Sequence, residues 1–137
     1  MQQKKTIDWL FVLPDDLIGG GAQQVLFTII NYLIAQGKNC TVIFLVRKKH
    51  HGWESLENKC TIVYLENTNV YKGFFSAAKH IRSLKKSYNI TYAISSQVLI
   101  NGLLGFLKYV KILKHTKLIL RESTSIFLRF KGFKLFL

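Results

Sequence analysis

The chain has 137 residues, of which 49% are hydrophobic and 13% aromatic, and it contains a single proline. This length and composition supply enough apolar surface for one packed core, which excludes a disordered chain and makes one domain the expectation. The formal net charge of +13 is uneven, because residues 1–66 hold seven basic and six acidic side chains whereas residues 67–137 hold thirteen basic and one acidic. The positive second half attracts phosphates of nucleic acid, anionic lipid or nucleotides, and it does not choose among them.

The first expected elements are a strand, a helix and a second strand. Ile7 to Leu13 is a short, almost wholly apolar run that ends at Pro14, which is typical of a strand buried on both faces of a parallel sheet. Ala22 to Gln36 is apolar almost all round, which predicts a helix packed between the sheet and its neighbours, and Gly37 is placed to end it. Cys40 to Val46 is rich in β-branched and aromatic residues and predicts the second strand.

The same alternation continues along the rest of the chain. A third strand is expected over Thr61 to Leu65, and an amphipathic helix lies between Gly73 and Tyr88. A fourth strand (Ile90 to Ile94), another helix (Val98 to Leu113) and a fifth strand (Leu118 to Leu120) follow. Strands that alternate with helices predict an α/β fold, here a single Rossmann-like domain with a doubly wound parallel sheet.

The sequence predicts a cytoplasmic protein. Its apolar N-terminal run resembles a secretion signal, but Asp8 interrupts that run, and Asp15 and Asp16 stand where small cleavage-site residues belong. No stretch reaches the roughly 18 uninterrupted apolar residues that a membrane-spanning helix needs. Cys40 and Cys60 lie at the edges of strand-like runs, which favours buried, reduced thiols. Peripheral contact with the inner face of a membrane remains compatible with this interpretation.

The turn after the first strand is the main candidate for a binding site, because ligands of open parallel sheets bind beyond the carboxyl ends of the strands. Here Gly19, Gly20 and Gly21 directly precede the first helix. Glycines let a ligand approach the backbone closely, and the free N–H groups at a helix N-terminus bind anions. The same glycines would also suit a tight turn with close packing of strand and helix, and both interpretations stay open.

Known cofactor motifs do not match this turn. A dinucleotide fingerprint that begins at Gly19 requires a small residue at the position of Gln24, and a basic run begins at Arg47, where a ribose-binding acid is expected. No Lys-Ser or Lys-Thr pair follows the glycines, so the turn is not a P-loop. We therefore expect no bound nicotinamide or flavin cofactor.

Two residue pairs are candidates for metal ligands. Adjacent histidines such as His50 and His51 point apart on a loop, and no third ligand is near in sequence. Turn chemistry explains Asp15 and Asp16 as well as a cation does. We expect no metal site.

The residues from 11 to 46, FVLPDDLIGGGAQQVLFTIINYLIAQGKNCTVIFLV, resemble the opening of a GT-B glycosyltransferase of family 4. In that family a strand is followed by a glycine-rich loop, a long apolar helix, a glycine and a second strand. The segments ITYAISSQ (90–97) and KLILREST (117–124) are similar to its fourth strand and to a fifth strand that ends in Arg-Glu-Ser. The family has two facing Rossmann-like domains, of which the first holds the acceptor and the second the sugar nucleotide.

The resemblance implies that residues 1–137 are the first domain of an enzyme that moves a sugar from a nucleotide-sugar to a polysaccharide or lipid-linked glycan. It implies that the turn Gly19 to Gly21 lies near the donor diphosphate. The acceptor side would be formed by residues after the fourth and fifth strands: Ser95, Ser96, Gln97, Arg121 and Glu122. Many relatives carry a histidine after one of these strands and this chain does not, so no catalytic residue is named. Features of the second domain are missing, and residues 124–137 end in unpartnered apolar side chains, so we expect a truncated chain without turnover of its own.

Two alternatives from other classes remain. A basic nucleic-acid-binding module has the charge in its favour but no recognisable binding motif, so no specific nucleic acid is expected. A stand-alone nucleotide-binding domain is the other. Basic residues interspersed with apolar ones also suit an anionic membrane surface, although a solvated face explains them equally well. These are Lys108, Lys111, Lys114, Arg129, Lys131 and Lys134.

Overall fold

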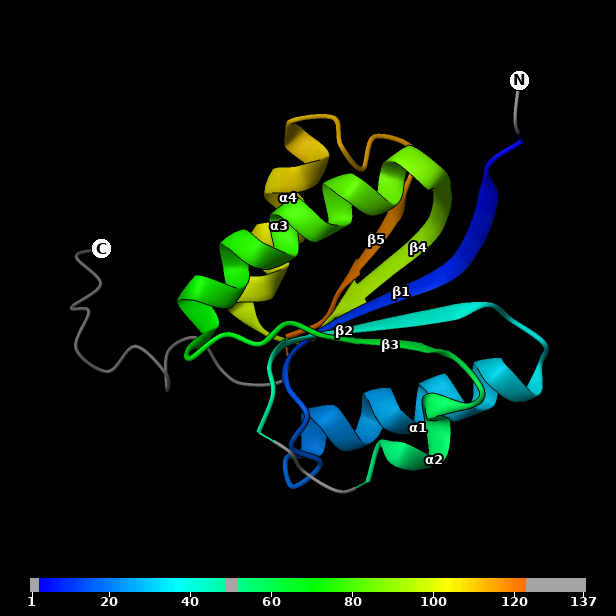
Figure 1. Ribbon diagram of the computed structural model, residues 1–137, viewed down its shortest axis with the longest axis vertical. Helices are drawn as coiled ribbons and strands as arrows, with labels where there is room; N and C mark the ends of the chain where they lie inside the picture. The colour runs from blue at the N-terminus through cyan, green and yellow to red at the C-terminus, as the bar shows by residue number, and fades with distance from the viewer. Residues whose placement is uncertain (1–2, 49–51, 123–137) are drawn as a thin grey trace.

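The computed structural model describes residues 3–48 and 52–122, which form a five-stranded, all-parallel β-sheet with helices on both faces (Figure 1). Helices α1 and α2 cover one face, and α3 and α4 cover the other. The predicted Rossmann-like, doubly wound α/β fold is confirmed. The elements are β1 (Lys5–Asp15), α1 (Gly21–Ala35), β2 (Cys40–Val46), α2 (Glu54–Glu57), β3 (Thr61–Tyr64), α3 (Val70–Ser87), β4 (Tyr88–Ser95), α4 (Val98–Tyr109) and β5 (Lys117–Leu120).

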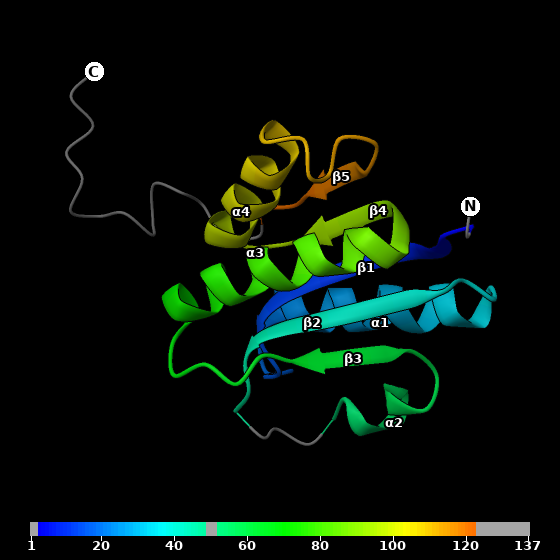
Figure 2. The same cartoon turned by 45° about the horizontal axis from the view of Figure 1, so that its top comes forward.

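The strand order is β3-β2-β1-β4-β5, which Figure 2 shows across the width of the sheet. From β1 the chain builds outward through β2 to β3, and it then returns to place β4 on the other side of β1. In the register of the central strands, Phe11 of β1 lies opposite Val42 of β2 and Ile94 of β4. The direction of winding therefore reverses between β1 and β4, and α/β sheets bind ligands at such a switch point.

Buried apolar side chains fill the space on both faces of the sheet. On β1, Leu10 and Val12 belong to the core under α3 and α4, whereas Phe11 and Leu13 belong to the core on the α1 side. Strand β2 alternates in the same way, so all seven of its residues are buried. Burial on both faces explains the continuous apolar runs from which the strands were predicted.

The first strand is longer than predicted. The sequence placed its end before Pro14, but β1 continues to Asp15. Pro14 lies beyond the last pair between β1 and β4, which joins Phe11 to Ile94, so β1 is paired on one side only at this point. A proline is tolerated at such an edge position because the missing N–H group interrupts no ladder there.

The helix predicted over Val98 to Leu113 is shorter than expected and ends at Tyr109. Lys111 takes a φ of +66°, a left-handed conformation that no helix continues through. Lys111, which the predicted helix included, and Lys114 therefore lie in turns after the helix.

Two other boundaries differ from the prediction. Helix α3 begins before Gly73, because the Asn69 side chain accepts a hydrogen bond of 2.9 Å from the Lys72 N–H group and caps the helix. The short helix α2 was not predicted, since a single turn has too few residues to show a periodic pattern. Residues 124–137, whose apolar ending was singled out, lie outside the described residues.

Candidate functional site

The candidate site lies at the edge of the sheet where all five strands end. Because the sheet is parallel, the loops that follow the strands meet at this edge. Helix α1 leaves the end of β1 on one face, and α4 leaves the end of β4 on the other (Figure 1). Since β1 and β4 are neighbours, the starts of these two helices border the switch point from its two sides.

The three glycines at the start of α1, of which Gly21 is the first helical residue, are exposed, and the described chain does not require them. A Cβ atom at Gly19 or Gly21 would meet no atom within 4 Å, and one at Gly20 would touch only the flexible end of Gln23. Among the described glycines, only Gly37 and Gly52 have a positive φ. The interpretation of these glycines as a tight turn with close packing therefore finds no support in the described residues. Because glycine has no side chain, the space above the turn is open.

The N-termini of α1 and α4 lack the usual partners. The capping residues, Gly20 for α1 and Gln97 for α4, make no side-chain hydrogen bond to the helix, and neither first turn carries an acidic residue. Helix α3 contrasts with them, because Asn69 caps it. The first N–H groups of a helix have no intrahelical acceptor and carry the positive end of its dipole. Two such ends beside one switch point favour an anionic ligand.

The predicted acceptor-side residues differ in their burial and in their hydrogen bonds. Ser95 is fully buried, and its hydroxyl donates a hydrogen bond of 2.5 Å to the Asn101 side chain. The Asn101 amide in turn donates to the Arg121 carbonyl at 3.0 Å, and the Arg121 N–H group donates to the Ser95 carbonyl at 2.9 Å. This Ser95-Asn101-Arg121 network ties together the ends of β4 and β5 and the start of α4. Ser95 thus has a structural role.

Of the other predicted residues, Ser96 is buried, Gln97 is half-buried, and Arg121 and Glu122 are exposed. The network holds the backbone of Arg121 beside the start of α4, where Gln97 is the N-cap residue. Polar side chains from the ends of two neighbouring strands are therefore available at one edge. The structure brings the predicted groups after β4 and β5 together, as the parallel sheet requires.

Sequence reasoning did not single out Asn101 as a functional residue. Its signal was a lone polar side chain near the start of an otherwise apolar helix, where an unexplained amide indicates a buried partner. Trp53 was missed as well. It is fully buried, its indole N–H donates to the Asp16 carbonyl at 3.0 Å, and its ring packs edge-on against Phe27 and Phe44.

Asp15, the last residue of β1, and Asp16, which follows it, bind the loop after β2. The Lys48 ammonium lies 3.2 Å from an Asp15 carboxylate oxygen, and the Lys48 N–H group donates to the Asp16 carboxylate at 2.8 Å. Asp15 also accepts a hydrogen bond from the Leu17 N–H group. These contacts make the aspartates part of the support for the glycine turn.

Within residues 3–48 and 52–122, no group of three or more histidine, cysteine, aspartate or glutamate residues is arranged to hold a metal ion. His50 and His51, the candidate histidine pair, lie outside these residues. In the same part of the chain, no helix has both the length and the apolar character needed to cross a membrane.

Comparisons of the chain with protein-family models, with curated proteins and with solved structures found no match.

Proposed function

We propose that the chain is the N-terminal, acceptor-side domain of a glycosyltransferase that uses a nucleotide-sugar donor and a polysaccharide or lipid-linked glycan acceptor. The observation that carries the proposal is the pair of helix N-termini without a side-chain cap beside the β1/β4 switch point, one of them formed by three exposed glycines. A donor diphosphate suits this arrangement because it is anionic and needs close access to backbone N–H groups. The resemblance of residues 11–46 to a GT-B opening supports the same assignment.

In sugar transfer the leaving diphosphate gains negative charge as the bond to the sugar breaks, and positioned dipoles or cations stabilise that charge. The start of α1 would supply the equivalent of about half a positive charge. This charge is only part of the stabilisation that the leaving diphosphate needs. A second, donor-binding domain would supply the remaining cations. We therefore propose that this chain alone has no transferase turnover.

The acceptor would lie toward Gln97 and Arg121. Amide and guanidinium groups recognise sugar hydroxyls as hydrogen-bond donors, and the amide also accepts. Ser95 and Asn101 are assigned a positioning role, because their hydrogen bonds fix the ends of β4 and β5 and the start of α4 without leaving the Ser95 hydroxyl free. Half-buried Gln97 and exposed Arg121 would then contact the acceptor from a rigid support.

Titration of the ¹⁵N-labelled chain with nucleoside diphosphates tests the diphosphate site. We expect amide shifts at Gly19, Gly20 and Gly21 and near Gln97, and weaker ones with the parent nucleosides, since the phosphates make the main contact. Absence of shifts at the turn with every nucleoside diphosphate up to about 10 mM would contradict the proposal, because such a Kd carries little binding energy.

Gly21→Glu sharpens this test. The new carboxylate would lie in open space at the start of α1. There it interacts favourably with the positive end of the helix dipole and repels a diphosphate. We expect the free energy of unfolding to rise by about 0.3–1 kcal/mol while diphosphate affinity falls. Thr28→Glu places the same charge on an exposed position in the middle of α1 and is expected to leave affinity unchanged. Equal loss in both variants would point to a non-specific charge effect.

A transfer assay separates a half-enzyme from a complete one. The chain is incubated with radiolabelled sugar nucleotides and a lipid extract, and incorporation of label into lipid or polymer is counted. We expect none. Clear transfer by this chain would contradict the proposed division of labour between two domains.

A further inference from the structure

The outer surface of α3 and α4 carries an open apolar groove of about 560 Å³. Its two most exposed members are Phe75 of α3, with 74% of its surface exposed, and Phe106 of α4, with 53%. We call this surface the α3–α4 face. The groove is lined by Phe74, Phe75, Val98, Leu99, Gly102 and Phe106.

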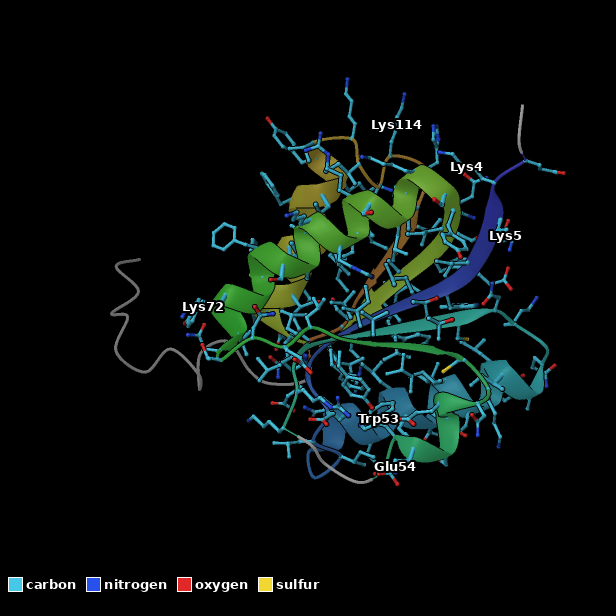
Figure 3. All side chains as sticks on the ribbon, in the orientation of Figure 1. Lys4, Lys5, Trp53, Glu54, Lys72 and Lys114 are labelled. Atoms are coloured by element: carbon cyan, nitrogen blue, oxygen red, sulfur yellow. The ribbon has the colours of Figure 1, made fainter. Side chains whose placement is uncertain are left out.

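Basic side chains share the exposed face of α3 with Phe75. Lys72, Lys79, Arg82 and Lys86 are exposed on α3 at the helical spacing that also presents Phe75. Figure 3 shows Lys72 at the start of α3 and Lys114 beyond the end of α4, both on the outside of this half of the molecule. Residues 67–121 contain ten lysine or arginine residues and no aspartate or glutamate. The α3–α4 face is therefore both apolar and uniformly positive.

This combination restricts what can cover the face. A second copy of the chain would bring a surface of the same charge against it, and like charges oppose contact. Residues 123–137 carry Arg129, Lys131 and Lys134 and no acidic residue, so this segment meets the same repulsion. A nucleic acid would neutralise the charge, but the groove lining offers no polar side chain to hydrogen-bond with bases. A bilayer with anionic lipid provides both a negative surface and an apolar phase.

We propose that the α3–α4 face docks on a membrane that contains anionic lipid. Phe75 and Phe106 enter the boundary between head groups and acyl chains, and Lys79 and Arg82 contact the head-group phosphates. The groove is lined by the first half of α3 and by α4, and these helices follow β3 and β4 at the edge of the candidate site. Docking would thus bring that edge close to the membrane. The proposal goes beyond the transferase assignment and does not depend on it.

Co-sedimentation of the full chain with lipid vesicles tests the docking. We expect binding to phosphatidylcholine vesicles that contain about 30% phosphatidylglycerol, and little binding to pure phosphatidylcholine, because each lysine or arginine gains energy only from anionic lipid. The double variants Phe75→Ala/Phe106→Ala and Lys79→Glu/Arg82→Glu should each weaken binding by about tenfold or more. All four side chains are exposed, so the fold should tolerate the changes.

Matched controls come from the opposite half of the molecule. Tyr32→Ala removes an aromatic ring of α1 that is 64% exposed, and Lys38→Glu/Lys59→Glu reverses two exposed charges. We expect both controls to bind vesicles like the parent chain. Equal losses in controls and face variants would overturn the proposal, as would failure of the parent chain to bind anionic vesicles.

Two further measurements separate other occupants of the face. If Phe75→Ala/Phe106→Ala converts a dimer into a monomer in light scattering, the face contacts a second copy and the proposal is wrong. If Arg129→Glu/Lys131→Glu/Lys134→Glu abolishes vesicle binding while the face variants retain it, the C-terminal segment is the membrane contact instead. Vesicle binding needs no nucleotide, so its failure is distinguishable from failure of the proposed transferase function.

Insertion has a direct optical signature. The indole introduced by Phe106→Trp should be quenched by lipids brominated on the acyl chains, and the indole introduced by Tyr32→Trp should not. Equal quenching at the two positions would contradict docking through this face.

Discussion

Gly73 of α3 lies directly against Leu45 of β2. A Cβ atom at Gly73 would come within 2.7 Å of the Leu45 Cβ atom and 2.9 Å of its carbonyl oxygen. Helix α3 therefore crosses the sheet at a distance that only glycine permits. This contact sets how closely α3 approaches the end of β2.

Gly73→Ala should destabilise the fold. Overpacking against backbone typically costs about 1–3 kcal/mol, which outweighs the gain of up to about 1 kcal/mol in helix propensity. Gly105→Ala in α4 is the matched control, since a Cβ atom there meets nothing within 4 Å, and we expect it to stabilise by about 0.5–1 kcal/mol. Urea unfolding measures both, and a Gly73→Ala variant as stable as the parent would contradict the close crossing.

The glycine turn should tolerate alanine without loss of stability. Gly19→Ala and Gly21→Ala add a Cβ atom in open space, and neither position has a positive φ. We expect changes within about 0.5 kcal/mol for each. Gly37→Ala should cost about 1–2 kcal/mol, because its φ of +75° is left-handed. Thermal unfolding decides the matter, and a large loss at Gly19 or Gly21 would show that the fold itself needs these glycines.

Asn101→Ala should destabilise the edge of the sheet. The substitution leaves the buried Ser95 hydroxyl without its partner and removes the donor to the Arg121 carbonyl, which costs about 1–3 kcal/mol. Asn31→Ala is the control, since the Asn31 side chain bonds only to the carbonyl one turn before it in α1. A double-mutant cycle with Ser95→Ala checks the coupling, and simple additivity would argue against the network.

Cys40 should react slowly with thiol reagents in the folded chain. Burial, with smaller contributions from Cys60 and Asp8, raises the pKa of the Cys40 thiol to about 11. At pH 8 the reactive thiolate would be about 0.1% of folded Cys40 but about a tenth of an unfolded cysteine with a pKa of 9.0. In a Cys60→Ser variant we expect the reaction with DTNB to be at least about a hundredfold slower before than after unfolding. Equal rates would mean that Cys40 is accessible.

The same thiol makes stability depend on pH. Because the pKa of Cys40 is higher in the folded chain, its contribution is fully present below the unfolded value of 9.0 and is lost as pH rises through about 11. We expect the unfolding free energy to fall over this window, and to fall less steeply in Cys40→Ala. Identical slopes in urea titrations of the two chains would exclude the thiol as a cause.

Much of the fold was readable from the sequence because burial leaves a strong pattern. Strand β2 was predicted with its observed bounds, since a strand buried on both faces is a continuous apolar run with sharp ends. The end of α4 was predicted too late in the sequence, because the left-handed residue that follows the helix is Lys111, whereas sequence patterns associate this conformation with glycine. The extension of β1 past Pro14 depends on which neighbour pairs there, and pairing is not a local property.

For the candidate site too, some features follow from the sequence and others only from the tertiary structure. The sequence by itself determined the alternation of strands and helices, and hence that the loops after parallel strands share one edge with the glycines. Only the tertiary structure decided that β4 lies beside β1, so that two uncapped helix N-termini border one switch point. It also assigned Ser95 to a buried hydrogen bond and gathered Phe75 and Phe106 on one exposed face. Local patterns fix which residues are apolar or permissive in conformation, whereas contacts between residues distant in the sequence depend on how the elements pack.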